Sequence, residues 1–110
     1  MIQIYKNYEG HKELEELDHI ELESWVMLTD PTMEELMNIS RDYKIDMDDL
    51  KAALDTEERS RLENEDDYTM ILVNIPVVEE EEGKKWYETI PLGIFITNKI
   101  VFTVCLEQTN

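Results

Sequence analysis

The chain has 110 residues and one cysteine, and its 27 acidic side chains outnumber its 10 lysines and arginines, for a formal net charge of −17. This length accommodates a single domain, and the charge argues against binding to a nucleic-acid backbone or to an anionic membrane surface. A compact body this acidic attracts counterions, divalent ones most strongly, although the plainer explanation is that the charge keeps the domain soluble.

The apolar residues near the C-terminus do not predict a membrane span. The longest apolar tract, 90–106, is shorter than the ~20 residues that a membrane-spanning helix needs, and Asn98 and Lys99 interrupt it. Cys105 lies in the apolar run 100–106 and is expected to be a small core residue of a protein in a reducing compartment. The chain is therefore expected to form a soluble domain.

Two strands are predicted in the first third of the chain. Ile2 and Ile4 alternate with polar residues in a short opening strand, and residues 20–28 form a second alternating segment with Trp25 on the opposite face. Residues 8–18 carry two leucines in a glutamate-rich run, which predicts a loop or a single helical turn.

A helix is predicted to begin at Thr32. This residue follows Pro31 and precedes Glu35 by three positions, which is the spacing of a capping box. The helix continues to about Tyr43. Its apolar stripe is predicted to consist of Met33, Leu36, Met37, Ser40 and Tyr43.

A second helix is predicted to begin at Asp46. Ile45 and Leu50 stand at the two positions of a hydrophobic staple, and Asp48 and Asp49 favour the positive end of the helix dipole. Its apolar stripe is predicted to consist of Met47, Leu50, Ala53 and Leu54. The middle of the chain is thus a helix pair joined by a tight bend.

The second half of the chain predicts strands. A short edge strand surrounds Leu62, where charges flank a lone apolar residue. Residues 68–78 are apolar on both alternating faces, unlike a half-exposed antiparallel strand, and predict a central strand that is covered on both sides. The remaining segments are a polar hairpin loop at 79–85, a return strand at 86–97, a tight turn at 98–99 and a last strand at 100–106.

These elements predict an α+β fold with a mixed sheet of five to six strands, in the order ββααβ followed by a β meander. The helix pair forms a crossover, and crossovers are right-handed. Two helices can cover only one face of the sheet, so the second apolar face is expected to be covered by residues beyond this chain or by another subunit. Residues 1–110 are therefore expected to form one domain of a larger protein.

The sequence patterns of catalytic sites are missing. The three glycines form neither a phosphate-binding loop nor a dinucleotide fingerprint, and no serine stands between glycines. His11 and His19 lack the second ligand cluster that a zinc site requires, and they are expected to lie in surface loops. An enzyme is therefore disfavoured.

The carboxylates could instead bind hard cations. Magnesium takes one or two carboxylates and keeps several waters, so its sites leave little signature in a sequence. Acidic residues cluster along the second predicted helix and its exit, at Asp46, Asp48, Asp49 and Asp55. Helix capping by Asp46 and Asp49, and solvation of the others, is the plainer explanation for each residue.

A series of short segments follows one another in a characteristic order. The segments are 25–32 (WVMLTDPT), 35–36, 45–46, 50–55, 57–63 (EERSRLE), 66–68, 75–76, 91–94 and 100–104. In this order and spacing they resemble the N-terminal cytoplasmic domain of the CorA family of magnesium and cobalt transport proteins. The resemblance covers essentially the whole chain.

The resemblance implies a mixed α/β domain that precedes a stalk helix and two transmembrane helices in a homopentameric channel. This chain would then be a regulatory domain at the cytoplasmic face of the cell membrane. Its partners would be its own stalk and transmembrane region, neighbouring subunits and divalent cations. Bound magnesium would stabilise the closed pentamer, and no cofactor would be needed for folding.

In some family members an aspartate of the second helix binds regulatory magnesium at the subunit interface. Counted along the resemblance, that position is Ala52 here. Asp48, Asp49 and Asp55 are the nearest candidates to replace it as Mg2+ ligands. The alternative to a transporter domain is a free-standing acidic module that binds a basic protein partner and has no role in transport.

Overall fold

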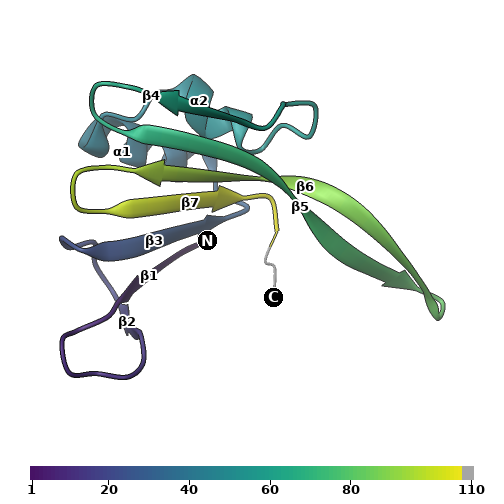
Figure 1. The fold of residues 1–110 in the computed structure, drawn as a ribbon, viewed down its shortest axis with the longest axis horizontal. Helices are drawn as coiled ribbons and strands as arrows, with labels where there is room; N and C mark the ends of the chain where they lie inside the picture. The colour runs from purple at the N-terminus through teal and green to yellow at the C-terminus, as the bar shows by residue number, and fades with distance from the viewer. Residues whose placement is uncertain (108–110) are drawn as a thin grey trace.

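The computed structural model describes residues 1–107 as a seven-stranded mixed sheet with two helices against one face (Figure 1). The elements are β1 (Ile2–Lys6), β2 (Glu15–Leu17), β3 (Ser24–Thr29), α1 (Met33–Tyr43), α2 (Met47–Ala52), β4 (Arg61–Asn64), β5 (Thr69–Glu81), β6 (Lys84–Ile96) and β7 (Val101–Cys105). The sheet order is β2-β1-β3-β7-β6-β5-β4. Strands β3 and β7 are parallel, and the other neighbours are antiparallel, so the predicted α+β class and mixed sheet are confirmed.

The predicted number of strands, five to six, is too low because β2 is missing from it. Residues 8–18 contain this three-residue strand, which pairs with β1 so that Ile4 lies opposite Leu17. Leu17 is its only apolar residue, and pairing with β1 rather than a local apolar pattern makes the segment a strand. The prediction of a loop or helical turn is therefore wrong for Glu15–Leu17, whereas residues 8–14 form turns and a loop.

Strand β3 begins later than its sequence pattern predicts. Residues 20–23 are outside the strand and end at Glu23, whose φ of 64° is left-handed and incompatible with an extended strand. The strand itself runs from Ser24, with Val26 and Leu28 fully buried. Trp25 lies on the opposite face, as predicted.

Helix α1 begins at the predicted capping box. Thr32 Oγ1 accepts the Glu35 N–H at 3.1 Å, and Glu35 Oε1 accepts the Thr32 N–H at 2.9 Å. The predicted stripe is partly wrong. Leu36 and Ile39 are buried between the helix and the sheet. Met33 and Met37 are 53% and 55% exposed, because the helix faces the sheet with Leu36, Ile39 and Tyr43.

Helix α2 also begins where predicted, with Asp46 Oδ1 accepting the Asp48 N–H at 2.7 Å. Its predicted stripe of Met47, Leu50, Ala53 and Leu54 contacts the core, and this prediction is confirmed. Ala52 joins these residues in the core. In the described residues 1–107, neither helix is long and apolar enough to cross a membrane.

The sequence predicts that strand β5 is central in the sheet, and this prediction is wrong. The strand is second from the edge, between β6 and β4. The helix-side residues Met70 and Leu72 are buried in the main core. On the other face Ile71 and Val73 are only half-buried. The apolar residues on one face of β5 pack in the main core, and those on the other face form a partly exposed surface. Apolar residues on both faces therefore do not require a central position in the sheet.

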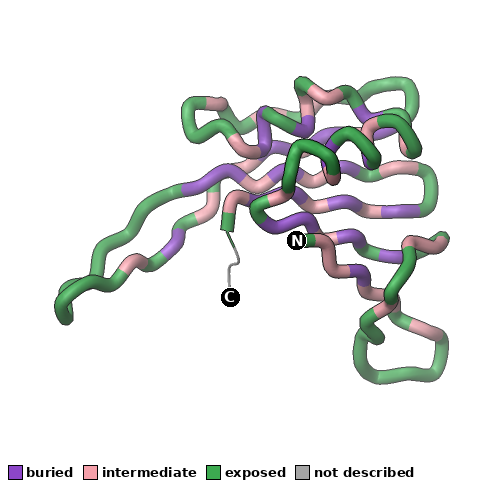
Figure 2. The backbone as a smooth tube through the Cα atoms, turned by 180° about the vertical axis from the view of Figure 1, so that it is seen from behind, coloured by how far each residue is buried: buried purple, intermediate pink, exposed green. Residues whose placement is uncertain are grey.

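Strands β5 and β6 continue beyond the rest of the sheet as a two-stranded arm, which is mostly exposed (Figures 1 and 2). The predicted polar loop at 79–85 is wrong, because only Glu82 and Gly83 form the turn, with φ of 53° and 79°. Glu80 lies opposite Lys85 and Glu81 opposite Lys84, so residues of opposite charge occupy facing positions on the two strands.

Candidate cation site

The three predicted cation ligands have different surroundings. Asp48 is exposed in the first turn of α2. Asp55 follows the helix, and its Oδ1 accepts the Glu57 N–H at 2.9 Å, which makes it a turn-stabilising residue. Asp49 is half-buried and faces the β4 edge of the sheet.

Asp49 lies beside two glutamates from the segment that includes β4. Asp49, Glu63 and Glu65 each offer a carboxylate oxygen, and these oxygens lie within 4.8 Å of one another. Asp48 and Asp55 do not belong to this group, which we call the acidic cluster. Within residues 1–107, the structure therefore brings together one of the three predicted ligands with two residues that the sequence does not single out.

The sheet register explains why the glutamates face Asp49. Glu63 lies opposite Met70 in the β4–β5 pair, and Met70 is buried on the helix side of the sheet. Side chains of opposite residues project to the same face, so Glu63 projects toward α2. Neighbouring residues of a strand point to opposite faces, so Leu62 and Glu63 lie on opposite faces of the edge strand β4. This alternation is the sequence signal that could have identified Glu63.

Tyr68 fixes the position of Asp49. Its ring is 6% exposed and lies 6.0 Å from the Phe95 ring, while its hydroxyl donates to an Asp49 carboxylate oxygen. The same hydroxyl oxygen accepts the Asp46 N–H at 3.2 Å. Burial, and then the bond to Asp49, raise the pKa of Tyr68 well above its usual value.

Arg61 supplies the positive charge beside the acidic cluster. Its Nε donates to Glu63 at 2.8 Å, and its Nη1 donates to Glu58 at 2.7 Å. The carboxylate of Glu65 is exposed. Carboxylate oxygens are the ligands that a hard divalent cation prefers, so the acidic cluster is a candidate site for such an ion.

The position that the resemblance assigns to a regulatory aspartate is not at the surface. Ala52 is 5% exposed and contacts the main core. A carboxylate at this position would lose its hydration without gaining a partner. Ala52 is thus a core residue in this structure, and Asp49 is the acidic residue of α2 with close carboxylate neighbours.

The sheet face opposite the helices carries an apolar hollow. Its lining consists of Trp25, Met27, Thr29, Leu92, Thr103, Cys105 and Glu107. The Trp25 indole donates to Thr103 Oγ1 at 2.8 Å and lies 5.6 Å from the Tyr5 ring. Cys105 is buried here, with Val77 and Ile90, in a small second core.

Comparison with known proteins gives a consistent set of relatives. Residues 23–110 match the family described as CorA-like Mg2+ transporter protein. The cobalt/magnesium transport protein CorA of Methanocaldococcus jannaschii is 34% identical over 92 residues, which are 80% of this chain and 27% of that protein. The chain therefore spans about a quarter of the length of this curated relative.

Two solved structures share the fold. The soluble domain of CorA from Methanocaldococcus jannaschii superposes with a TM-score of 0.75 and 29% identity, covering 98% of this chain and 41% of that chain. The complete CorA magnesium transporter of the same organism superposes with a TM-score of 0.71 and 28% identity, covering 98% of this chain and 33% of that one.

Proposed function

The chain belongs to the family of CorA-like Mg2+ transporter proteins, and on this premise we propose that it is the regulatory domain of a divalent-cation transporter. The observation that carries the proposal is the match of 98% of the chain to the CorA soluble domain. The matching family and the curated relative are described as transporters rather than as enzymes. The domain would lie on the cytoplasmic side of the membrane.

The whole protein would assemble as a homopentamer, with its conducting segments outside residues 1–110. In this assembly the sheet face around Trp25 and Cys105 would be covered by helical segments of the same protein. Support comes from the apolar hollow on that face and from the greater length of the relatives. Residues 1–110 would then form one domain with two covered faces.

Regulation would depend on magnesium bound near the N-terminal part of α2. Asp49 is the best placed of the three predicted ligands, because Glu63 and Glu65 lie beside it. Asp48 and Asp55 would contribute through the negative field around α2. A net charge of −17 makes neighbouring copies repel one another, and bound Mg2+ would reduce that repulsion when internal magnesium is high.

Cobalt uptake by cells that express the complete gene tests this proposal. We expect uptake above that of cells without the gene, and we expect it to fall as internal magnesium rises. The Asp49→Asn variant should need more internal magnesium to reach the same fall. Glu13→Gln removes the same charge from an exposed residue of the β1–β2 connection and should behave as wild type.

Two results would contradict the proposal. Absence of gene-dependent cobalt uptake would remove the transporter function and favour the acidic interaction module. If Asp49→Asn and Glu13→Gln changed the internal magnesium needed for a given fall in uptake by the same amount, magnesium would act by general screening rather than at the acidic cluster.

A further inference from the structure

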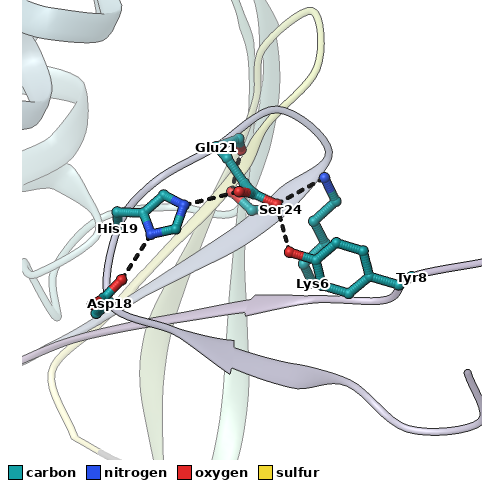
Figure 3. Close-up of polar contacts among 6 residues, drawn as sticks. All are labelled: Lys6, Tyr8, Asp18, His19, Glu21 and Ser24. Atoms are coloured by element: carbon teal, nitrogen blue, oxygen red, sulfur yellow. Dashed lines mark hydrogen bonds and ion pairs between the residues drawn. The ribbon is translucent and has the colours of Figure 1, made fainter.

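A network of polar side chains joins the end of β1 to the connection between β2 and β3 (Figure 3). Glu21 is its centre. The Glu21 carboxylate accepts from Lys6 Nζ at 2.9 Å and from the Tyr8 hydroxyl at 2.8 Å, and it lies 2.9 Å from His19 Nε2. Lys6 and Tyr8, which come from an earlier segment, and the nearby His19 thus converge on one side chain.

The same connection is anchored to two other places. The Ser24 hydroxyl donates to the Glu21 carbonyl at 2.6 Å, and the Glu23 N–H donates to the Lys99 carbonyl in the β6–β7 turn at 2.6 Å. Edge strand β2 precedes this connection, and within residues 1–107 its strand partner is β1 alone. Contacts at Glu21 therefore help to hold the β1–β2 edge against the sheet.

His19 has a carboxylate at each ring nitrogen. Nδ1 lies 2.7 Å from Asp18 Oδ1, and Nε2 lies 2.9 Å from Glu21 Oε2. A neutral imidazole carries one N–H, so it can donate to only one of the two carboxylates, and its other nitrogen would face an acceptor. Both contacts are satisfied together only by the doubly protonated ring.

The charges around His19 favour that protonated ring. Asp18 and Glu21 contact it directly, and Lys6 and Tyr8 share Glu21 with it. Glu23 acts on Lys6 and Glu15 acts on Tyr8, rather than on the His19 ring itself. The contact with Asp18 first, and that with Glu21 second, raise the pKa of His19 above its ordinary value of 6.5. The pKa of Glu21 is lowered to about 2 by its hydrogen bonds, of which the one from Lys6 has the largest effect, followed by those from Tyr8 and His19.

We propose that His19 is a proton-operated latch whose protonated ring clamps the β2–β3 connection between Asp18 and Glu21, and whose deprotonation loosens the β1–β2 edge. A raised pKa in the folded state means that the latch is fully closed below pH 6.5 and opens as the pH rises through the folded-state value. The closed state is lost again in acid, when Asp18 and Glu21 take up protons, and the contact with His19 lowers the pKa of both carboxyl groups. The latch does not depend on the proposed transporter function.

Hydrogen exchange of the amides of Glu15–Leu17 between pH 5.5 and 8.5 tests the latch, with the His19 ring nitrogens followed by NMR in the same samples. After correction for intrinsic exchange, we expect the opening equilibrium constant of the β2 amides to increase about two- to fivefold as His19 loses its proton. This is the fold-change that corresponds to the loss of an exposed ion pair. His19→Gln keeps a polar side chain without the charge and should abolish the step.

The matched control is His11→Gln, which removes the chain's other histidine. His11 Nδ1 meets a single carboxylate, that of Glu15, at 2.8 Å, and a neutral ring satisfies this contact. This variant should keep the step. A step that persists in His19→Gln, a His19 ring that titrates at or below pH 6.5, or titration of His19 without a change in exchange would each overturn the proposal.

Discussion

At the scale of single residues, Tyr68 connects the apolar core to the acidic cluster. Its ring is buried against Phe95, and its hydroxyl bonds both Asp49 and the backbone of Asp46. The hydroxyl therefore stabilises the start of α2 and orients a candidate cation ligand at the same time.

Replacing Tyr68 by phenylalanine should lower the free energy of unfolding by about 1–2 kcal/mol, because the Asp46 N–H and the half-buried Asp49 carboxylate lose a partner. Urea denaturation measures this change. The control is Tyr87→Phe. Tyr87 is 77% exposed, so this substitution should change the free energy of unfolding by less than about 0.5 kcal/mol. Equal effects of the two substitutions would contradict the assigned role of the hydroxyl.

The alkaline behaviour of Tyr68 follows from its raised pKa. The folded state favours the neutral hydroxyl, so this stabilisation is present below pH 10 and is lost as the pH rises through the folded-state pKa. The phenylalanine variant should lack this part of the alkaline loss.

The candidate site was only partly predictable from residues alone. Asp49 is recognisable because an acidic residue near a helix start is a candidate for capping or for cation binding. Glu63 and Glu65 become its neighbours through the pairing of β4 with β5, a long-range register that local patterns do not contain. Glu21 escapes prediction for the same reason, because its partners Lys6 and Tyr8 come from an earlier segment of the chain.

At the scale of elements, the capping box of α1 is the most predictable feature, because its residues are neighbours in the sequence. Thr32→Ala should reduce stability by about 1 kcal/mol in thermal or urea unfolding. Thr32→Ser retains the hydroxyl and should stay near wild type. A loss of the same size in Thr32→Ser would show that the hydroxyl bond is not responsible.

The capping box also predicts an acid dependence. The Thr32 N–H is the main cause that lowers the pKa of Glu35, despite partial burial. This contribution is present above pH 4.5 and disappears as the pH falls through the lower folded-state value.

Gly93 sets the distance between β6 and the end of α2. A Cβ added there would lie 2.5 Å from Ala53 Cβ and 2.9 Å from the Phe95 ring. Gly93→Ala should therefore destabilise the fold by about 1–3 kcal/mol. In a double-mutant cycle with Ala53→Gly, which creates space, the double variant should lose less stability than the sum of the single variants. Additive losses would contradict the steric explanation.

Elements that depend on distant partners are the ones that sequence patterns mispredict. Strand β2 has two glutamates and one leucine, and only its pairing with β1 makes it a strand. The acidic run 79–82 has the composition of a loop, yet three of its residues are paired in the arm opposite Lys84–Trp86. In both cases cross-strand pairing overrides a weak local preference.

At the scale of the whole molecule, the sheet has one face covered by α1 and α2 and one face with an apolar hollow. The sequence predicts this asymmetry, because two helices supply too little surface for both faces. It does not predict the strand order, in which β5 stands near the edge. Strand order depends on which pairs form over long sequence distances, and apolar content alone does not distinguish them.

An NMR titration of the chain with MgCl2, compared with NaCl at matched ionic strength, shows whether this domain binds magnesium at the acidic cluster. We expect the backbone signals of Asp49, Glu63 and Glu65 to shift saturably with Mg2+ and not with Na+. These shifts should disappear in Asp49→Asn and persist in Glu13→Gln. Equal, non-saturating shifts with the two salts would contradict magnesium binding at the acidic cluster.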